Sequence, residues 1–266
     1  MKKIITYSTI AISALLLMGG CAEDSGKEPK VKIEEHSTKH ETHKHWGYSG
    51  NVAPENWGKL DEKFKMCSEG KIQMPIDIRP TKDIDLPKLD LKYGAKSKSI
   101  INNGHTVQVN IDNGDTLTVD GNVYELKQFH FHTPSENHIN GKSFPLEAHF
   151  VHSTKDGKLA VISVMFKEGA MNPTLTKIIK TFPLGENKSK KLELSKEYID
   201  VMMPKDKDYY KTMGSLTTPP CSENVLWIIF KNPQTASKAQ IEAMHKEINK
   251  DNNRPIQPTN GREIYE

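Results

Sequence analysis

The sequence has 266 residues and a mass of 30.0 kDa, and its 37 lysines and arginines nearly balance 34 aspartates and glutamates, for a net charge of +3. Hydrophobic residues make up 35% of it, which in a chain of this length is enough for one large domain with a substantial core. The balanced charges give no basic surface for DNA or RNA, so we expect no nucleic-acid partner. Beyond the N-terminus no apolar stretch is long enough to span a bilayer, which excludes a polytopic membrane protein.

The first 20 residues have the pattern of an export signal. Two lysines precede the apolar stretch Ile4–Met18, and two glycines separate this stretch from Cys21. The Gly-Gly-Cys sequence resembles a bacterial lipobox, whose cysteine becomes the lipid-modified N-terminus of the mature chain. We therefore expect residues 1–20 to be a lipoprotein-type signal peptide and Cys21 to be lipidated. An ordinary secreted protein and a retained signal anchor are the alternatives.

This pattern also predicts where the protein is found. We expect it to be exported to the periplasm or the cell surface, and to touch a bacterial membrane only through its lipid anchor.

Residues 21–44 read as a polar, flexible tether, because they contain almost nothing that could be buried in a core. This region and its edge carry His36, His40, His43 and His45, so a metal-capturing tail is an alternative to a solvated linker. From residue 45 to residue 266 there is no second linker, repeat or low-complexity block. We expect this stretch to be one continuous domain.

Two further cysteines, Cys67 and Cys221, form an even pair in a chain that we expect to be exported. A disulfide between them is the natural expectation in an oxidising compartment, and two free thiols are the alternative.

Strand patterns dominate the middle of the chain. Apolar and polar residues alternate before and after a turn at 112–115, and two further segments, Leu159–Phe166 and Val225–Phe230, are apolar on both faces and therefore central. The other expected strands are Val107–Ile111, Leu117–Val119, Tyr124–His132 and Leu146–His152.

Helix patterns are fewer. Asn172 and Pro173 predict the start of a short helix that runs to Phe182, and Ser237–Asn249 is amphipathic, with its apolar residues at helical spacing. The sequence therefore predicts a β-dominated α+β fold: a single domain on a large central, mostly antiparallel β-sheet, with short peripheral helices.

Three histidines on two of the expected strands point to a metal. Side chains alternate along a strand, so Gln128, His130 and His132 share one face while the phenylalanines between them enter the core. On the second strand, Glu147 and His149 share a face. Three neutral imidazoles with a fourth position left open are typical of a catalytic zinc site.

The His-X-His pattern alone is weak evidence for a metal. Here Gln128 and Glu147 lie on the same faces as the histidines and could orient the ligand rings, which strengthens the prediction. His138 and His152 have no such neighbours, and we interpret them as turn or packing histidines.

Several long motifs together resemble the α-class carbonic anhydrases, in particular the exported bacterial type. The resemblance covers nearly all of residues 45–266. It is carried by five blocks: His45–Tyr48, Asn102–His105, the stretch from Ser135–Asn137 to Glu147–Val151, Ser215–Pro220 and Asn253–Pro258.

The resemblance implies reversible hydration of CO₂ to bicarbonate and a proton, with one Zn²⁺ per domain held by His130, His132 and His149. Gln128 and Glu147 would be the outer partners of the ligands. Zinc-bound hydroxide would attack CO₂, since zinc lowers the pKa of its water to about 7, the value established for carbonic anhydrase itself.

The resemblance also assigns roles around the metal. Thr217 would accept the proton of the nucleophile and donate to Glu136, and Thr218 would line the substrate side; without the family, this segment would read as a turn. His105 would be the proton shuttle, although an isolated histidine after Asn-Gly is more often an exposed turn residue. The apolar CO₂ pocket would be Val151, Val161, Leu216 and Trp227, and the water network would be lined by Tyr48, Asn103 and Gln108.

The same resemblance implies a disulfide between Cys67 and Cys221, and it predicts a homodimer.

Two other functional classes are the alternatives. An inactive binding module of this fold would have lost a zinc ligand, whereas this chain keeps all three together with Thr217 and Glu136. A zinc-storing lipoprotein would use the His36–His45 segment and bind several weak ions instead of one tight ion.

Overall fold

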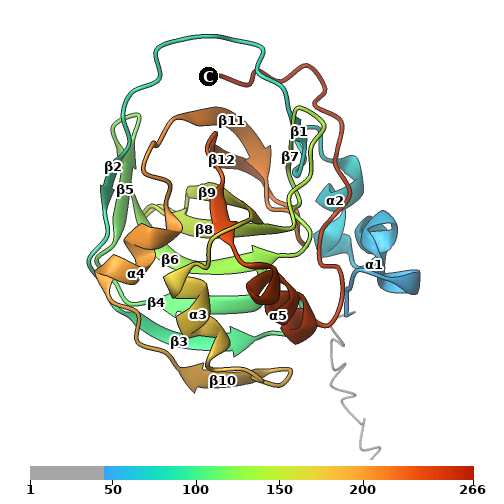
Figure 1. Cartoon of the computed structure of the whole chain (residues 1–266). Coiled ribbons are helices and arrows are strands. Elements are labelled where there is room, and N and C mark those ends of the chain that lie inside the picture. The colour runs from blue at the N-terminus through green and yellow to red at the C-terminus, as the bar shows by residue number, and fades with distance from the viewer. Residues whose placement is uncertain (1–44) are drawn as a thin grey trace, which may run out of the picture. The chain divides into compact units, whose positions relative to one another are not determined.

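A twisted sheet of eleven strands runs through the centre of the computed structural model, which describes residues 45–266 (Figure 1). The expected signal peptide, Cys21 and the tether fall in residues 1–44 and so lie outside the described residues. Within the described part of the chain, no helix combines the length and apolar character needed to cross a membrane.

The strands are short at the start of the chain and long in its middle. Their bounds are β1 Asp77–Ile78, β2 Asp90–Lys92, β3 Ser97–Asn102, β4 Val107–Ile111, β5 Thr116–Val119, β6 Asn122–His132, β7 His138–Ile139, β8 Leu146–Ser153, β9 Leu159–Glu168, β10 Lys188–Lys191, β11 Tyr209–Ser215, β12 Glu223–Phe230 and β13 Gln234–Ala236.

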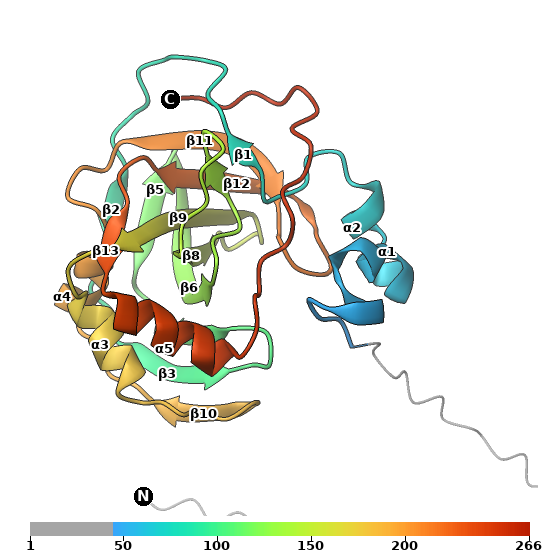
Figure 2. The ribbon, with the colours of Figure 1, turned by 45° about the vertical axis from the view of Figure 1, so that its right-hand side comes forward.

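The helices are short, as predicted. They are α1 Trp57–Leu60, α2 Met66–Glu69, α3 Pro173–Ile179, α4 Lys196–Met202 and α5 Lys238–Ile248, with 3₁₀ turns at Gly50–Val52, Pro54–Asn56 and Glu62–Phe64. Figure 2 shows α3, α4 and α5 gathered on one side of the sheet, while α1 and α2 lie on another.

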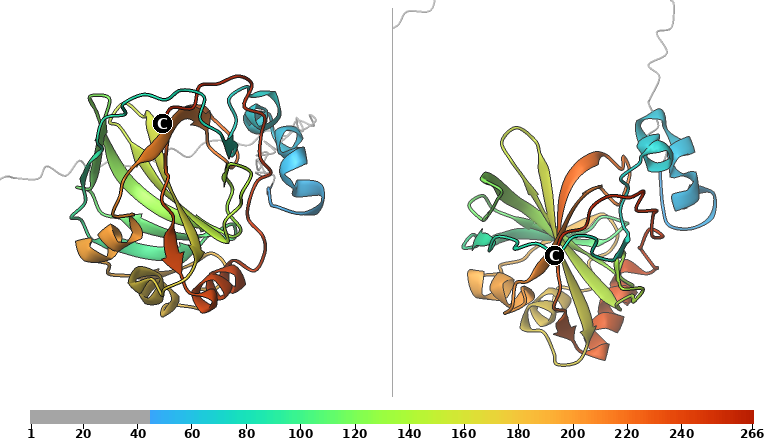
Figure 3. Two further views of the ribbon diagram at one scale, coloured as in Figure 1. Left: turned by 45° about the horizontal axis from the view of Figure 1, so that its top comes forward. Right: turned by 90° about the horizontal axis from the view of Figure 1, so that it is seen from above.

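The strand order is β10-β3-β4-β6-β8-β9-β12-β11, with β5 and β2 continuing beside β6 and β13 beside β9. All neighbours in this sheet are antiparallel except β9–β12 and β9–β13, which are parallel. The views in Figure 3 show the strands fanning out with the twist expected of a large sheet. The predicted fold class is thus confirmed.

The segment around residues 112–115 connects its two strands differently from a hairpin. Strands β4 and β5 do not pair with each other; both pair with the long strand β6, β4 along its second half and β5 along its first. The turn therefore carries the chain from the second half of β6 to its first half, and it does not form a β-hairpin between β4 and β5.

Helices α5 and α3 begin at their predicted capping residues. Ser237 and Gln240 form a reciprocal capping box at the start of α5, and the left-handed Asn249 ends it. Helix α3 is capped by Asn172 but ends at Ile179, three residues earlier than predicted. Pro183 accounts for part of this difference, because the residue before a proline is disfavoured in helical conformation.

Each face of the sheet packs a separate core. Phe129, Phe131 and Phe150 are fully buried beneath α3, α4 and α5, on the face opposite the histidine ligands. A second cluster, which includes Val161 and Trp227, covers part of the other face. The sheet therefore presents an apolar wall and a polar site side by side on this second face.

The predicted disulfide is present. Cys67 in α2 is joined to Cys221, with a Cα–Cα distance of 5.0 Å, and both half-cystines pack against the fully buried Trp57. Because 154 residues separate the two cysteines, the bond ties the first helices to the loop before β12.

His152 is a packing histidine in the main core, as the sequence indicated. It is fully buried, and its Nε2 lies 2.8 Å from the Tyr93 hydroxyl. Burial lowers the pKa of His152 to about 4. The folded protein therefore keeps this ring neutral at pH values where the unfolded chain would already have protonated it.

We expect His152 to limit stability in acid. Between about pH 6.5 and 4 the unfolded chain binds a proton that the folded state does not, so stability should fall by about 3 kcal/mol over this range. Above pH 6.5 this contribution should be constant. His152→Gln cannot take up the proton, so its free energy of unfolding, measured in urea, should fall less between pH 7 and pH 4.5.

The exposed His245, which lies 2.9 Å from Asp251, gives a control: His245→Gln removes no buried neutral ring, so its loss of stability in acid should be no smaller than that of the parent protein. An equal loss in His152→Gln and the parent would contradict the prediction.

Candidate active site

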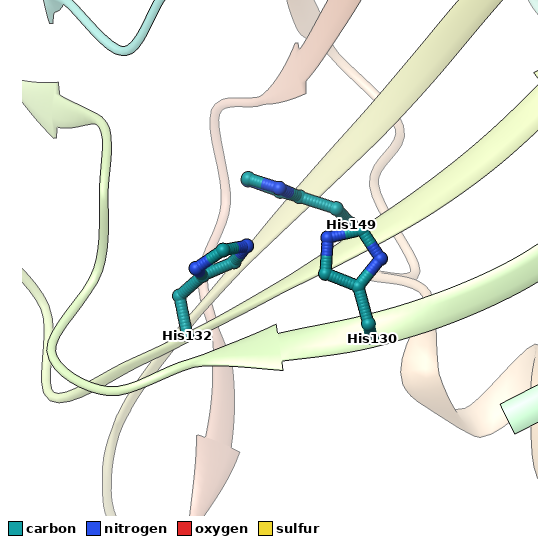
Figure 4. A group of neighbouring side chains, drawn as sticks. All are labelled: His130, His132 and His149. Carbon is teal, nitrogen blue, oxygen red and sulfur yellow. The ribbon is translucent and has the colours of Figure 1, made fainter. Parts of the chain in front are cut away.

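The register between β6 and β8 brings the three predicted ligands together. His130 lies directly opposite His149, and His132 lies opposite Glu147. One ring nitrogen from each histidine lies within 4.8 Å of the others. Figure 4 shows the two rings of β6 and the ring of His149 gathered around a shared space.

The other nitrogen of each ring is held by the protein. His130 Nδ1 lies 2.8 Å from Gln128 Oε1, and His149 Nε2 lies 2.8 Å from Glu147 Oε1. His132 Nδ1 lies 2.7 Å from the backbone carbonyl of Asn252. Each acceptor holds the ring proton on the nitrogen that it contacts, so His130 Nε2, His132 Nε2 and His149 Nδ1 keep their lone pairs and face one another.

Glu147 is a fully buried carboxylate in a dense set of donors. It accepts hydrogen bonds from the backbone N–H groups of Glu136 and Asn137, from Asn137 Nδ2 and from Ser163 Oγ, at 2.6–2.9 Å. Burial acts to raise its pKa, but His149 and these hydrogen bonds outweigh burial and lower the pKa to about 2. Glu147 is therefore charged and can orient His149 at neutral pH.

The three rings suit a cation such as Zn²⁺. His132 and His149 are only 1% and 2% exposed, and His132 Nε2 is a buried atom without a hydrogen-bond partner. Burial lowers the pKa of both His130 and His132, so the rings are neutral and their free nitrogens carry lone pairs. Three convergent, neutral imidazole nitrogens are the donors that zinc prefers.

Glu136 is the second buried carboxyl of the site. Its Oε1 accepts the backbone N–H of Arg254 at 2.9 Å, and its Oε2 lies 3.4 Å from His132 Nε2. Burial raises its pKa to about 7, against the lowering effects of His149, the Arg254 N–H and the Thr217 hydroxyl. The predicted pair of Thr217 and Glu136 is thus brought together beside the ligands.

The four residues predicted for an apolar pocket form one wall. Val161 and Trp227 belong to the second core, and the half-buried Val151 and Leu216 pack against it. The Trp227 ring contacts His149 edge-on, with ring centroids 5.0 Å apart. Thr218 is half-buried on the same loop as Thr217, where its carbonyl accepts the N–H of Cys221.

His105 lies in the turn between β3 and β4. The Asn103 side chain accepts the backbone N–H groups of His105 and Thr106, which shapes this turn. Asn252 Nδ2 donates to the His105 carbonyl, and the carbonyl of Asn252 holds His132. Asn252 therefore connects the turn that carries His105 to His132, one of the predicted ligands.

The His105 ring stacks on Trp46, with centroids 3.7 Å apart and planes 7° apart. Burial, followed by the charges of Lys250 and His45, lowers its pKa to about 4. The sequence suggested a ring that titrates near neutral pH. In this stacked position the ring is instead a weaker base than a free histidine.

The other residues predicted to line the water network are engaged by protein groups. Gln108, opposite His130 on β4, donates from Nε2 to Asn110 at 2.7 Å. Burial and the nearby Glu136 raise the pKa of Tyr48 well above its usual value, so this hydroxyl keeps its proton.

Sequence reasoning did not find three residues that support the site: Asn137, Asn252 and Arg254. Asn252 and Arg254 act through backbone groups, which no side-chain pattern reveals. The Arg254 guanidinium is almost fully buried and donates to Gln73 and to the carbonyls of Met74 and Cys67.

Comparison with known proteins decides the family. The family model described as eukaryotic-type carbonic anhydrase matches residues 52–266. The chain belongs to this family, the α-class carbonic anhydrases. It is therefore an enzyme of the carbonic anhydrase class.

Bacterial relatives and solved structures agree with this assignment. The carbonic anhydrase of Pectobacterium carotovorum is 46% identical, with 83% of this chain and 90% of the relative covered, and that of Neisseria gonorrhoeae is 43% identical, with 85% and 90% covered. The structure of the α-carbonic anhydrase from Thermovibrio ammonificans with the inhibitor sulfanilamide has a TM-score of 0.80 and 44% identity, covering 84% of this chain and 99% of that one.

We expect Glu147→Gln to weaken metal binding without removing a ligand. The amide keeps the size of the side chain but loses the charge that orients His149, so zinc affinity should fall by about 10- to 100-fold. Competition with a chromophoric chelator measures this affinity. Glu125→Gln, on the neighbouring strand, makes the same change outside the site and should bind zinc like the parent. Equal affinities in both variants would contradict the role of Glu147.

Proposed function

We propose that this protein catalyses the reversible hydration of CO₂ to bicarbonate and a proton, with one Zn²⁺ as cofactor. The convergence of three ring nitrogens, while a protein acceptor holds the other nitrogen of each ring, is the observation that carries the proposal. His130, His132 and His149 would hold the ion. When bound, zinc supplies a hydroxide nucleophile near neutral pH, because it acidifies water.

Thr217 and Glu136 would orient the nucleophile. Glu136 is buried beside the ligands and faces the Thr217 hydroxyl, so that hydroxyl can donate to the carboxylate. The Thr217 oxygen can then only accept a hydrogen bond, which the proton of the nucleophile would donate. This arrangement fixes the direction of that proton and turns a lone pair toward the substrate, which is catalysis by positioning.

The apolar wall would hold CO₂ next to the nucleophile. CO₂ has no net dipole, and it gains from contact with Val151, Val161, Leu216 and Trp227, whereas water gains nothing there. Thr218 would lie on the side where the anionic product leaves. The contact between Trp227 and His149 supports this placement, because it joins the wall to the ligands.

His105 would accept the proton that each turnover releases. Its ring is neutral at physiological pH, so one ring nitrogen can accept a proton delivered through water from the site. Tyr48, Asn103 and Gln108 would line this route. Because the stacked ring is a weak base, His105 would pass the proton on and not retain it.

We also propose that the protein acts outside the cytoplasm. The disulfide and the bacterial relatives support export. Lipidation of Cys21 would hold residues 45–266 at a bacterial membrane by way of the polar segment 21–44. The homodimer stays a prediction from the resemblance.

Replacing any one ligand, in His130→Ala, His132→Ala or His149→Ala, should abolish tight zinc binding. Two imidazoles are too few to hold the ion against solvent, so the metal content should fall from one per chain to nearly none. Metal analysis after dialysis measures this. His138→Ala removes a histidine outside the site and should keep its zinc. Full occupancy in a ligand variant would remove that histidine from the proposed site.

His105→Ala and Thr217→Ala should separate the proton step from the chemical step. Without His105, kcat should fall by about ten-fold or more in weak buffer while kcat/KM is preserved, and added imidazole should restore kcat. Thr217→Ala should lower kcat/KM, because it disturbs the nucleophile itself. Stopped-flow CO₂ hydration distinguishes these cases. If His105→Ala lowered both parameters equally and no buffer rescued it, His105 would be structural.

A further inference from the structure

One polar side chain lies in the middle of an otherwise apolar stretch of the central strand β9. Ser163 is fully buried, and its neighbours on the same face of the strand, Val161 and Met165, belong to the second core. Across the sheet it lies opposite His149 on β8 and opposite Ile229 on β12. A hydroxyl at this position has lost its hydrogen bonds to water, so the protein has to replace them.

The Ser163 hydroxyl has one hydrogen-bond partner among the described residues, and that partner belongs to the candidate site. Its Oγ donates to Glu147 Oε1 at 2.6 Å. The same oxygen lies 2.8 Å from Asn137 Nδ2 and 2.8 Å from His149 Nε2. Three donors from three different segments of the chain therefore surround one carboxylate oxygen, and the donor on β9 makes the shortest of these contacts.

The need for a small side chain does not account for a serine at this position. Alanine would fill nearly the same space among apolar neighbours without a buried hydroxyl to satisfy. What the hydroxyl adds is a fixed position for one oxygen of Glu147. The backbone N–H groups of Glu136 and Asn137 hold Oε2, at 2.7 and 2.9 Å, and Ser163 holds Oε1 from the neighbouring strand.

We propose that Ser163 is a positioning residue of the metal site: through Glu147 it fixes the direction of the His149 ring and so raises the affinity of the three histidines for zinc. This inference rests on the proposed zinc cofactor. Groups that hold a metal ligand from behind change metal affinity without being ligands themselves. Ser163 lies one contact further out than Glu147, so its effect should be smaller than that of Glu147.

The affinity test compares Ser163→Ala with Ser97→Ala. Ser163→Ala should bind zinc about three- to ten-fold more weakly than the parent, measured by competition with a chromophoric chelator. Ser97 is buried in β3, where its hydroxyl donates to the carbonyl of Leu192 at 2.6 Å, outside the candidate site. Ser97→Ala therefore also loses a buried hydroxyl, and it should lose stability while it binds zinc like the parent.

The metal-free protein gives a readout that depends neither on zinc nor on turnover. The Nε2 proton of His149 is buried and held by Glu147, so its NMR signal should exchange slowly with water. In Ser163→Ala the carboxylate is held less firmly, and this proton should exchange several-fold faster. Ser97→Ala should leave the exchange unchanged. Equal exchange in Ser163→Ala and the parent would overturn the proposal.

A double variant tests whether Ser163 acts through the carboxylate. In Glu147→Gln the charge that orients His149 is already gone, so adding Ser163→Ala should weaken zinc binding much less than it does in the parent. If the two losses of affinity multiplied in the double variant, Ser163 would act independently of Glu147, and the proposal would be wrong.

Two results of the affinity test would also overturn it. One is zinc binding in Ser163→Ala equal to that of the parent. The other is an equal loss of affinity in Ser97→Ala, since a general loss of stability would then explain both variants. Failure of the proposed function looks different: the parent protein itself would then bind no zinc tightly, although exchange of the His149 proton would still respond to Ser163→Ala.

Discussion

The antiparallel register of β6 and β8 is the constraint on which the rest of the site depends. It sets His130 opposite His149 and His132 opposite Glu147, so one pairing places three ligands and one of their supports. Because side chains alternate with a period of two, a shift of one residue would turn the histidines of one strand into the phenylalanine core. The burial of Phe129, Phe131 and Phe150 against α3, α4 and α5 therefore also fixes the metal site. The packing of the phenylalanines on one face of the sheet therefore determines where the histidines lie on the other face.

The site contains two buried carboxyl groups, and the hydrogen bonds that each accepts influence whether it is charged. Glu147 and Glu136 are equally buried, yet the pKa of the first is lowered to about 2 and that of the second is raised to about 7. Glu147 receives four hydrogen bonds besides its contact with His149, while Glu136 accepts the backbone N–H of Arg254 and faces the Thr217 hydroxyl. Burial disfavours the charged form of both carboxyl groups, and the hydrogen-bond donors around each one determine which of them stays charged. Two glutamates eleven residues apart thus acquire different roles.

Much of this arrangement could be predicted from local patterns. Alternation along β6 and β8 indicated the shared face of Gln128, His130 and His132, and apolar runs identified β9 and β12 as central strands. The weakly patterned strand β3 and the edge strand β10 were not predicted, and neither was the pairing of both β4 and β5 with β6. The roles of Thr217 and His105 came only from family resemblance, because both lie in turns. The backbone groups of Asn252 and Arg254 carry no sequence signal, and the burial that weakens His105 as a base depends on tertiary contacts, among them its stacking on Trp46.

Two residues near the C-terminus, Asn252 and Arg254, hold side chains of the candidate site in place, so the site is complete only after these residues have been made. Asn252 contacts His132 across 120 positions of the chain, and Arg254 reaches Glu136 across 118 positions and Cys67 across 187. A chain that is still emerging from a ribosome or a translocation channel can pair β6 with β8, but its ligand His132 has no acceptor behind it and Glu136 has no clamp. The proposed zinc site consequently has its full set of supports only in the completed polypeptide. Contacts of such long range also form slowly. A chain that lacks its last residues would therefore hold the proposed ligands without the contacts that orient His132 and Glu136.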